Sequence, residues 1–189
     1  MNRNSTLTSA AALALFAGLI TAGVQRAHAA DSPTDLQIAG IVLTADNLDI
    51  EYGKIALAKS KDKSIREFAQ RMVTDHQAVQ LGVLALAEKL GVNAEDSAVR
   101  TNLREGSKAV FEKLNSLTGT EFDKYYINNE VAYHKAVTDA VAAVLIPSAR
   151  NADLKAALVG SQPLFLRHLE HARMVQAVAN QVMNGKKGK

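Results

Sequence analysis

The chain has 189 residues, with 22 basic side chains, 19 acidic side chains and no cysteine. The lack of cysteine excludes disulfides, thiolate metal sites and cysteine nucleophiles. Two of the basic residues, Arg3 and Arg26, lie in a segment that we expect to be removed, which leaves 20 basic and 19 acidic side chains, so the charge does not indicate nucleic-acid binding.

The first 29 residues have the pattern of a secretory signal peptide. Arg3 supplies a short basic start, and the apolar run at residues 10–20 is shorter than the roughly 20 residues of a membrane-spanning helix. Ala27-His28-Ala29 is the small-x-small pattern that signal peptidase cuts. We therefore expect cleavage near Ala29 and a periplasmic mature protein without a transmembrane span. An uncleaved membrane anchor is the alternative.

The mature chain is predicted to be one all-α domain. Residues 30–184 are enough to bury a hydrophobic core, and their apolar residues recur every three or four positions, which is typical of α-helices. We predict an antiparallel four-helix bundle with an extra short connecting helix. Residues 185–189 contain three lysines and are predicted to be a disordered basic tail.

The first two predicted helices form a hairpin. The apolar stripe of the first helix runs from Ile38 to Ala56. The second helix is predicted to begin after Asp62, which can act as N-cap, and to end at Gly91, which can adopt the left-handed conformation of a helix stop. Because only Ser60 and Lys61 separate the two helices, they should pack antiparallel.

The rest of the chain is predicted to contain a connecting helix and two further long helices. Residues 92–119 suggest the connecting helix, interrupted around Gly106. The sequence Thr120-Glu121-Phe122-Asp123 resembles a capping box and is predicted to open a long helix that ends at Pro147. A break at residues 160–163 is predicted to precede the final helix.

Each of the four long predicted helices carries one ionisable residue within its apolar stripe. These residues are Asp49, His76, His134 and His168. The helical rise of about 1.5 Å per residue places Asp49 and His76 within about one turn of the same level. A bundle directs such stripes at one axis, so the four side chains should converge in the core, together with Phe68 and Met72 as core residues.

Buried Asp and His cost several kcal/mol unless they are paired, hydrogen-bonded or metal-bound. Two interpretations stay open: a hydrogen-bond network that fixes helix register, and a metal site. The spacings of Glu130 four residues before His134 and of His171 three residues after His168 allow two ligands from one helix. The candidate ligands are therefore Asp49, His76, His134 and His168, with Glu130 and His171 in reserve, and the candidate ions are Cu, Zn and Fe.

Several stretches resemble a bacterial family of exported proteins, domain of unknown function 4142, whose members are often labelled outer membrane proteins. They are Asp49-Ile50-Glu51-Tyr52-Gly53-Lys54-Ile55-Ala56, Phe68-Ala69-Gln70-Arg71-Met72-Val73-Thr74-Asp75-His76, Phe122-Asp123-Lys124-Tyr125 and His168-Leu169. The Met-Val-x-Asp-His block is the most specific of these motifs. The resemblance implies a ferritin-like bundle in the cell envelope and suggests His76, His134 and His168 as matching positions. It implies no established activity, and where this chain has Asp49 the family usually has Glu.

The spacing around the histidines argues against oxygen-activating di-iron chemistry. Such ferritin-like enzymes use Glu-x-x-His motifs, whereas Val73, Val131 and Phe165 stand three residues before the histidines here. The leading hypothesis is a periplasmic metal-binding or envelope stress-related protein. The alternative is a structural or interaction module that binds an envelope protein or a second copy and holds its histidines in a metal-free network. An enzyme ranks third, because no nucleophile or substrate pocket is indicated.

Overall fold

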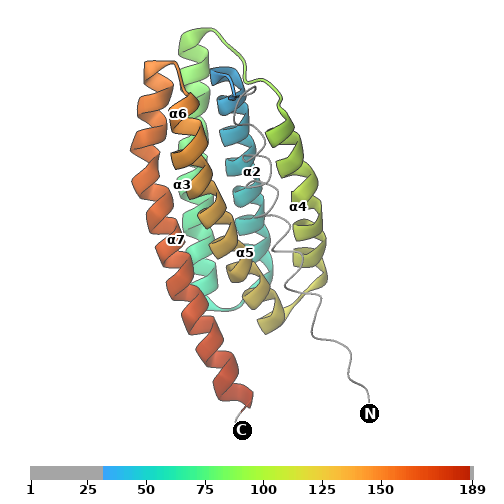
Figure 1. The fold of residues 1–189 in the computed structure, drawn as a ribbon. Coiled ribbons are helices and arrows are strands. Elements are labelled where there is room, and N and C mark those ends of the chain that lie inside the picture. The colour runs from blue at the N-terminus through green and yellow to red at the C-terminus, as the bar shows by residue number, and fades with distance from the viewer. Residues whose placement is uncertain (1–31, 188–189) are drawn as a thin grey trace.

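The computed structural model of the protein describes residues 32–187, and no strand occurs among them. The prediction of an all-α fold is therefore confirmed. The predicted signal peptide and its cleavage site lie outside the described residues. The helices are α2 (Asp35–Lys59), α3 (Lys63–Leu90), α4 (Ala98–Ser116), α5 (Gly119–Ala140), the π-helix η1 (Val141–Leu145), α6 (Ile146–Ser148) and α7 (Ala152–Lys187) (Figure 1).

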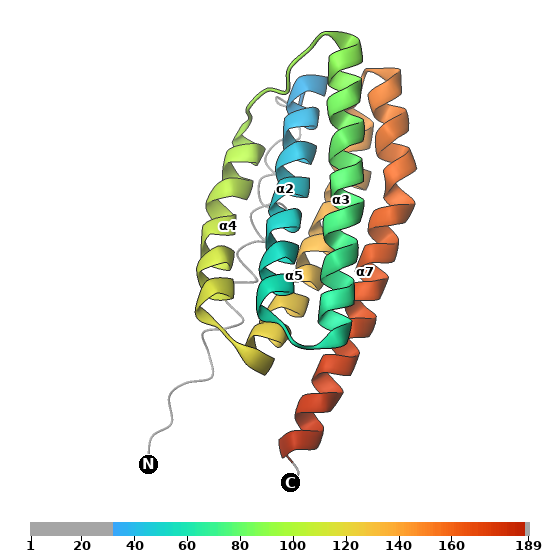
Figure 2. The ribbon, with the colours of Figure 1, turned by 180° about the vertical axis from the view of Figure 1, so that it is seen from behind.

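The long helices lie side by side around a shared apolar core. Helix α2 packs most extensively against α3, and α5 against α7, while α3 also contacts α7 and α2 contacts α5. Helix α4 lies along the outside, next to α2 (Figures 1 and 2). Buried side chains from all of these helices belong to one hydrophobic cluster. No helix among the described residues is long and apolar enough to cross a membrane.

The hairpin of α2 and α3 matches its sequence signals. The Asp62 carboxylate accepts a hydrogen bond from the Ile65 backbone N–H at 3.1 Å, as expected of an N-cap. Gly91 adopts the left-handed conformation with φ of 64° and ends α3. The start of α2 carries a capping box between Thr34 and Gln37, which the sequence reading did not identify. Local signals thus set the bounds of both helices.

The predicted interruption of the connecting helix is wrong. Helix α4 passes through Gly106 without a break, although a glycine inside a helix costs about 1 kcal/mol relative to alanine. Its apolar side chains compensate by packing into the core, where Leu103, Val110 and Leu114 are buried. Tertiary packing therefore outweighs the local preference at this position.

The predicted capping box at Thr120 is also wrong, because α5 begins one residue earlier at Gly119. Gly119 has φ of 57°, a conformation that glycine adopts without strain, and it completes the turn from α4 into α5. The N-cap is Thr118, whose side chain makes no capping hydrogen bond. Backbone hydrogen bonding starts there instead, since the Phe122 N–H donates to the Thr118 carbonyl at 3.3 Å.

Proline ends one helix close to the predicted place but does not break the last one. Helix α5 is followed without a gap by η1 and α6, so the helical segment passes Pro147 and ends at Ser148. The predicted break at residues 160–163 is wrong, because α7 is continuous with Pro163 inside it. An internal proline costs about 3 kcal/mol, and the burial of Leu158 and Phe165 on either side offsets that cost.

Helix α7 also extends further than expected at its C-terminal end. It reaches Lys187 and so includes residues 185–187, which the sequence reading placed in a disordered tail.

Gly53 allows α2 and α3 to approach closely, one helical turn beyond Asp49. A Cβ at Gly53 would lie 2.8 Å from the Val73 Cγ2 atom and 3.1 Å from the Ala69 carbonyl oxygen. We expect Gly53→Ala to lower the free energy of unfolding by about 1–3 kcal/mol, because overpacking outweighs the better helix propensity of alanine.

Urea denaturation followed by circular dichroism measures this change. The matched control is Gly82→Ala on α3, where an added Cβ meets nothing within 4 Å. The control is expected to be neutral or to stabilise by up to about 1 kcal/mol. Equal effects of the two substitutions would show that the α2–α3 contact at Gly53 is not tight.

Candidate metal centre

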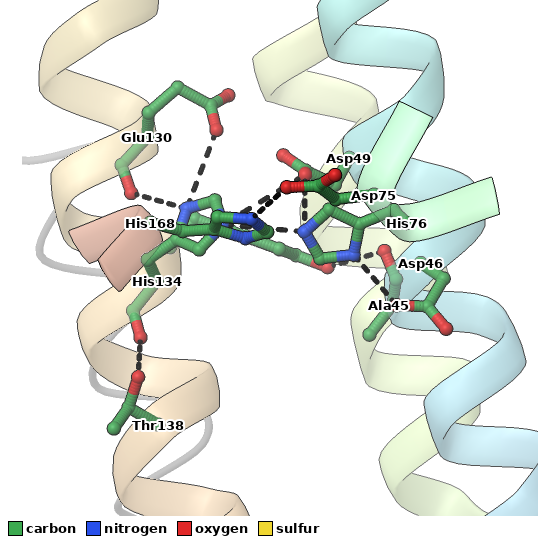
Figure 3. Close-up of polar contacts among 10 residues, drawn as sticks. Ala45, Asp46, Asp49, Asp75, His76, Glu130, His134, Thr138 and His168 are labelled. Carbon is green, nitrogen blue, oxygen red and sulfur yellow. Dashed lines mark hydrogen bonds and ion pairs between the residues drawn. The ribbon is translucent and has the colours of Figure 1, made fainter. Parts of the chain in front are cut away.

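Three histidine rings meet in the core, each from a different helix (Figure 3). His76 comes from α3, His134 from α5 and His168 from α7, and the exposed fractions of these residues are 2%, 0% and 1%. Their ring centroids form a nearly equilateral triangle with sides of 5.2, 5.4 and 5.6 Å. The convergence expected from the apolar stripes is present, and the break that was expected near Pro163 does not displace His168.

Hydrogen bonds to neighbouring acceptors hold two of these rings in place. The Nδ1 atom of His76 lies 2.7 Å from the Asp46 carboxylate of α2. The Nδ1 atom of His134 lies 3.0 Å from the backbone carbonyl oxygen of Glu130, one turn earlier on α5. Both acceptors require a proton on Nδ1, which directs Nε2 toward the centre.

His168 is held in the same manner but through its other ring nitrogen. Its Nε2 atom lies 2.9 Å from the Asp75 carboxylate of α3. Its Nδ1 atom is buried and has no hydrogen-bond partner among the described residues. An outer hydrogen bond that fixes the orientation of a ring is the usual arrangement of histidines that bind metal ions. All three rings have one.

The nitrogens that face the centre lie at distances suited to one ion. The Nε2 atoms of His76 and His134 are 3.4 Å apart. The Asp49 Oδ2 atom lies 2.8 Å from the first and 3.9 Å from the second. Tetrahedral zinc with bonds of about 2.0–2.1 Å places its ligand atoms about 3.3 Å apart. One nitrogen from each of the three histidines falls within 4.8 Å of the others.

Glu130 adds a second carboxylate beside this centre. It is fully buried, and its Oε2 atom lies 3.5 Å from the His134 Nδ1 atom. Oxygens of Glu130 and Asp49 and a nitrogen of His134 also lie within 4.8 Å of one another. Neither Glu130 oxygen has a hydrogen-bond partner among the described residues.

The two carboxylates have opposite pKa shifts. Burial alone would raise the pKa of Asp49, but the charges of His76 and His134 outweigh it and hold that pKa below its usual range. Burial raises the pKa of Glu130 well above its usual value, and the charge of Asp49 adds to the shift. Asp49 is thus an ionised carboxylate at neutral pH, whereas the surroundings of Glu130 favour its protonated form.

The three histidines also differ in pKa. Burial opposes the charged form of His76, but the charge of Asp49 and the hydrogen bond that His76 donates to Asp46 raise its pKa to about 10. Burial dominates at His134 and lowers its pKa to about 4. Burial also lowers the pKa of His168. His134 and His168 are therefore neutral at pH 7, which is the form that binds metal ions.

The structure brings together five of the six candidate ligands and leaves out the sixth. Asp49, His76, Glu130, His134 and His168 line the centre. His171 is half-buried on α7, belongs to neither group of possible ligands, and packs its ring against Phe68 with a centroid distance of 5.2 Å. Its spacing three residues after His168 does not place it near the same ion.

The sequence reading did not assign roles to Asp46 and Asp75. Asp46 lies three residues before Asp49, and its 2% exposure shows that it shares the buried face of α2. Asp75 directly precedes His76 in the Met-Val-x-Asp-His block. The i, i+3 spacing could have indicated Asp46. Only the packing of α7 against α3 shows what Asp75 contacts.

Comparison with known proteins gives one match. The sequence model of a family described as Domain of unknown function (DUF4142) matches residues 21–175. All the residues that line the centre or orient its histidines lie within that range. No curated protein and no solved structure matches the chain.

Proposed function

The chain belongs to the family described as Domain of unknown function (DUF4142), and we propose from the geometry of its buried centre that it binds one transition metal ion. The ligand atoms are His76 Nε2, His134 Nε2, His168 Nδ1 and Asp49 Oδ2. Imidazole suits Zn, Cu and Fe, and a four-coordinate set of three histidines and one carboxylate favours Zn²⁺ among them.

The orientation of the three histidines is the observation that carries this proposal. Each ring uses one nitrogen for an outer hydrogen bond, and one nitrogen from each of the three rings lies within 4.8 Å of the others. A hydrogen-bond network alone would leave the buried His168 Nδ1 atom without a partner. Each such atom costs about 1–3 kcal/mol, and a bound cation together with its coordination sphere would remove part of that cost.

Metal binding at this centre would be coupled to proton release. In the metal-free protein His76 is charged, and its Nε2–H donates to Asp49 at 2.8 Å. An ion that binds both groups takes the place of this proton. Glu130 would stay as a neutral acid beside Asp49, so the ligand set carries one negative charge.

The burial of the ligands favours holding an ion over turning over a substrate. The four ligand residues are at most 2% exposed. Catalytic metal sites instead keep a position open to water or substrate. We propose a metal-sequestering or metal-stress role in the periplasm, after removal of the signal peptide, on a ferritin-like antiparallel four-helix bundle with α4 as the connecting helix.

A metal-free network within a structural or interaction module is the second candidate function. The pairing of charged His76 with Asp46 and Asp49 favours it, because these three charged side chains already link α3 to α2 without a metal ion. It leaves the unpartnered Nδ1 atom of His168 without an explanation.

Metal titration of the tag-free protein separates the two functions. We expect wild type to bind one equivalent of Zn²⁺ more tightly than micromolar in calorimetry, which corresponds to more than about 8 kcal/mol. His134→Gln should weaken binding at least 100-fold. Its unfolding free energy without metal should fall by only about 1–2 kcal/mol, because the His134 Nδ1 atom hydrogen-bonds only within its own helix.

The control for this titration is His171→Gln, which changes a histidine outside the centre. It is expected to bind zinc as wild type does. Parallel titrations with Cu and Fe test the choice of ion, and elemental analysis of the purified protein gives its native content. If wild type binds none of the three ions at micromolar concentration, the network function replaces the metal function.

A further inference from the structure

The three groups that orient the histidines differ in their access to solvent. The side chain of Asp46 is 2% exposed and Glu130 is fully buried. The side chain of Asp75, by contrast, is 27% exposed. Asp75 is therefore the point where the hydrogen-bonded surroundings of the centre reach the surface of the protein, at the edge between α3 and α7.

Two adjacent residues on α3, Asp75 and His76, have different roles at the centre. Successive positions on a helix point about 100° apart. His76 contacts Asp46 and Asp49 of α2, whereas Asp75 contacts His168 of α7. Asp75 thus supports a ligand on the neighbouring helix, while His76 is itself a ligand.

The hydrogen bond that His168 donates to Asp75 sets which nitrogen of His168 is left to bind the ion. Because Nε2–H donates to this carboxylate, Nδ1 is the unprotonated atom, and it is buried without a hydrogen-bond partner among the described residues. A carboxylate acceptor also makes the ring a stronger ligand than a neutral acceptor would. Loss of the bond frees the ring to turn away from the ion toward the solvent-exposed side.

From these contacts, and on the basis of the proposed metal site, we propose that Asp75 is a positioning residue that locks His168 onto the ion, and that the ion exchanges with solvent along the α3–α7 edge at Asp75. His168 is then the ligand that leaves first and binds last. His76 and His134 stay in the core throughout exchange.

Release of metal to a chelator tests this proposal. We expect Asp75→Asn to weaken Zn²⁺ or Co²⁺ binding about 10–100-fold, and we expect most of this loss as a faster release rate into excess EDTA. The visible absorption of the Co²⁺-loaded protein should change, because the His168 contribution to coordination weakens. Asp75→Glu keeps the carboxylate and should retain slower release than Asp75→Asn.

The matched control is Asp153→Asn, the same chemical change at another contact between α3 and α7. Asp153 lies 2.7 Å from Lys89 and is exposed, away from the ligands. It should release metal at the wild-type rate. Thermal melts of the metal-free variants show whether each variant is folded. If Asp75→Asn is not folded, Asp75→Glu takes its place as the test variant.

The outcomes separate this proposal from the proposed function. If wild type binds no ion, both are overturned. If wild type binds zinc but Asp75→Asn releases it at the wild-type rate, the metal site stands and the role of Asp75 is overturned. Equal acceleration in Asp75→Asn and Asp153→Asn would overturn it too, because general loosening of the α3–α7 contact would then explain the effect.

Discussion

Replacing His76 with glutamine is expected to lower the free energy of unfolding of the metal-free protein by about 3–5 kcal/mol. The two ring nitrogens of His76 contact Asp46 and Asp49 at 2.7 and 2.8 Å, and both carboxylates are buried. The single amide group of glutamine cannot donate to both sites and carries no charge. Urea denaturation at pH 7 in the presence of EDTA, followed by circular dichroism, measures the loss.

The control for this change is His171→Gln on α7. The His171 side chain is half-buried and contacts neither carboxylate, so a loss of about 1 kcal/mol or less is expected. A loss below about 1 kcal/mol in His76→Gln would contradict the buried charged contacts of His76 with Asp46 and Asp49. His76→Gln should also lose tight zinc binding, because it removes a proposed ligand.

The contribution of His76 to stability should depend on pH. Its pKa is raised from 6.5 to about 10 in the folded protein, so the unfolded chain releases this proton at lower pH than the folded one. The stabilisation is fully present below pH 6.5 and is lost as pH rises toward 10. The difference between wild type and His76→Gln should therefore shrink above pH 7, by at most about 1.4 kcal/mol per pH unit.

Replacing Phe68 with alanine is expected to lower the free energy of unfolding by about 3–5 kcal/mol. Phe68 is fully buried, as the stripe of the second helix predicted. Its ring packs against those of Tyr126, His134 and His171, with centroid distances of 6.2, 6.4 and 5.2 Å. Truncation opens a cavity beside a proposed ligand, because the surrounding helices cannot collapse fully.

Urea denaturation again measures the effect, with Leu81→Ala as control. Leu81 lies on the same helix but is 67% exposed, so its truncation should change stability by less than about 0.5 kcal/mol. Similar losses for the two variants would contradict the assignment of the buried face of α3. Zinc affinity of Phe68→Ala should fall less than that of His134→Gln, since the ligands themselves remain.

Hydrophobic periodicity and short-range capping signals by themselves determined the all-α class and the bounds of α3. The Asp62 cap and the Gly91 stop act within a few residues of the helix ends, so no tertiary information was needed. The same periodicity placed His76 and His134 on buried faces. The helical rise also predicted that Asp49 and His76 lie at a similar height along the bundle, because both stand on regular helices that one short turn connects.

Only the tertiary structure decided where local preferences fail. Gly106 and Pro163 predict breaks when read alone, yet burial of neighbouring apolar side chains keeps both helices continuous. The hydrogen-bond partners of the buried polar groups could likewise not be predicted from the sequence. Asp75 reaches His168 only because α7 packs against α3. Helix period determines which side chains turn inward, but the packing of distant segments determines which of them meet.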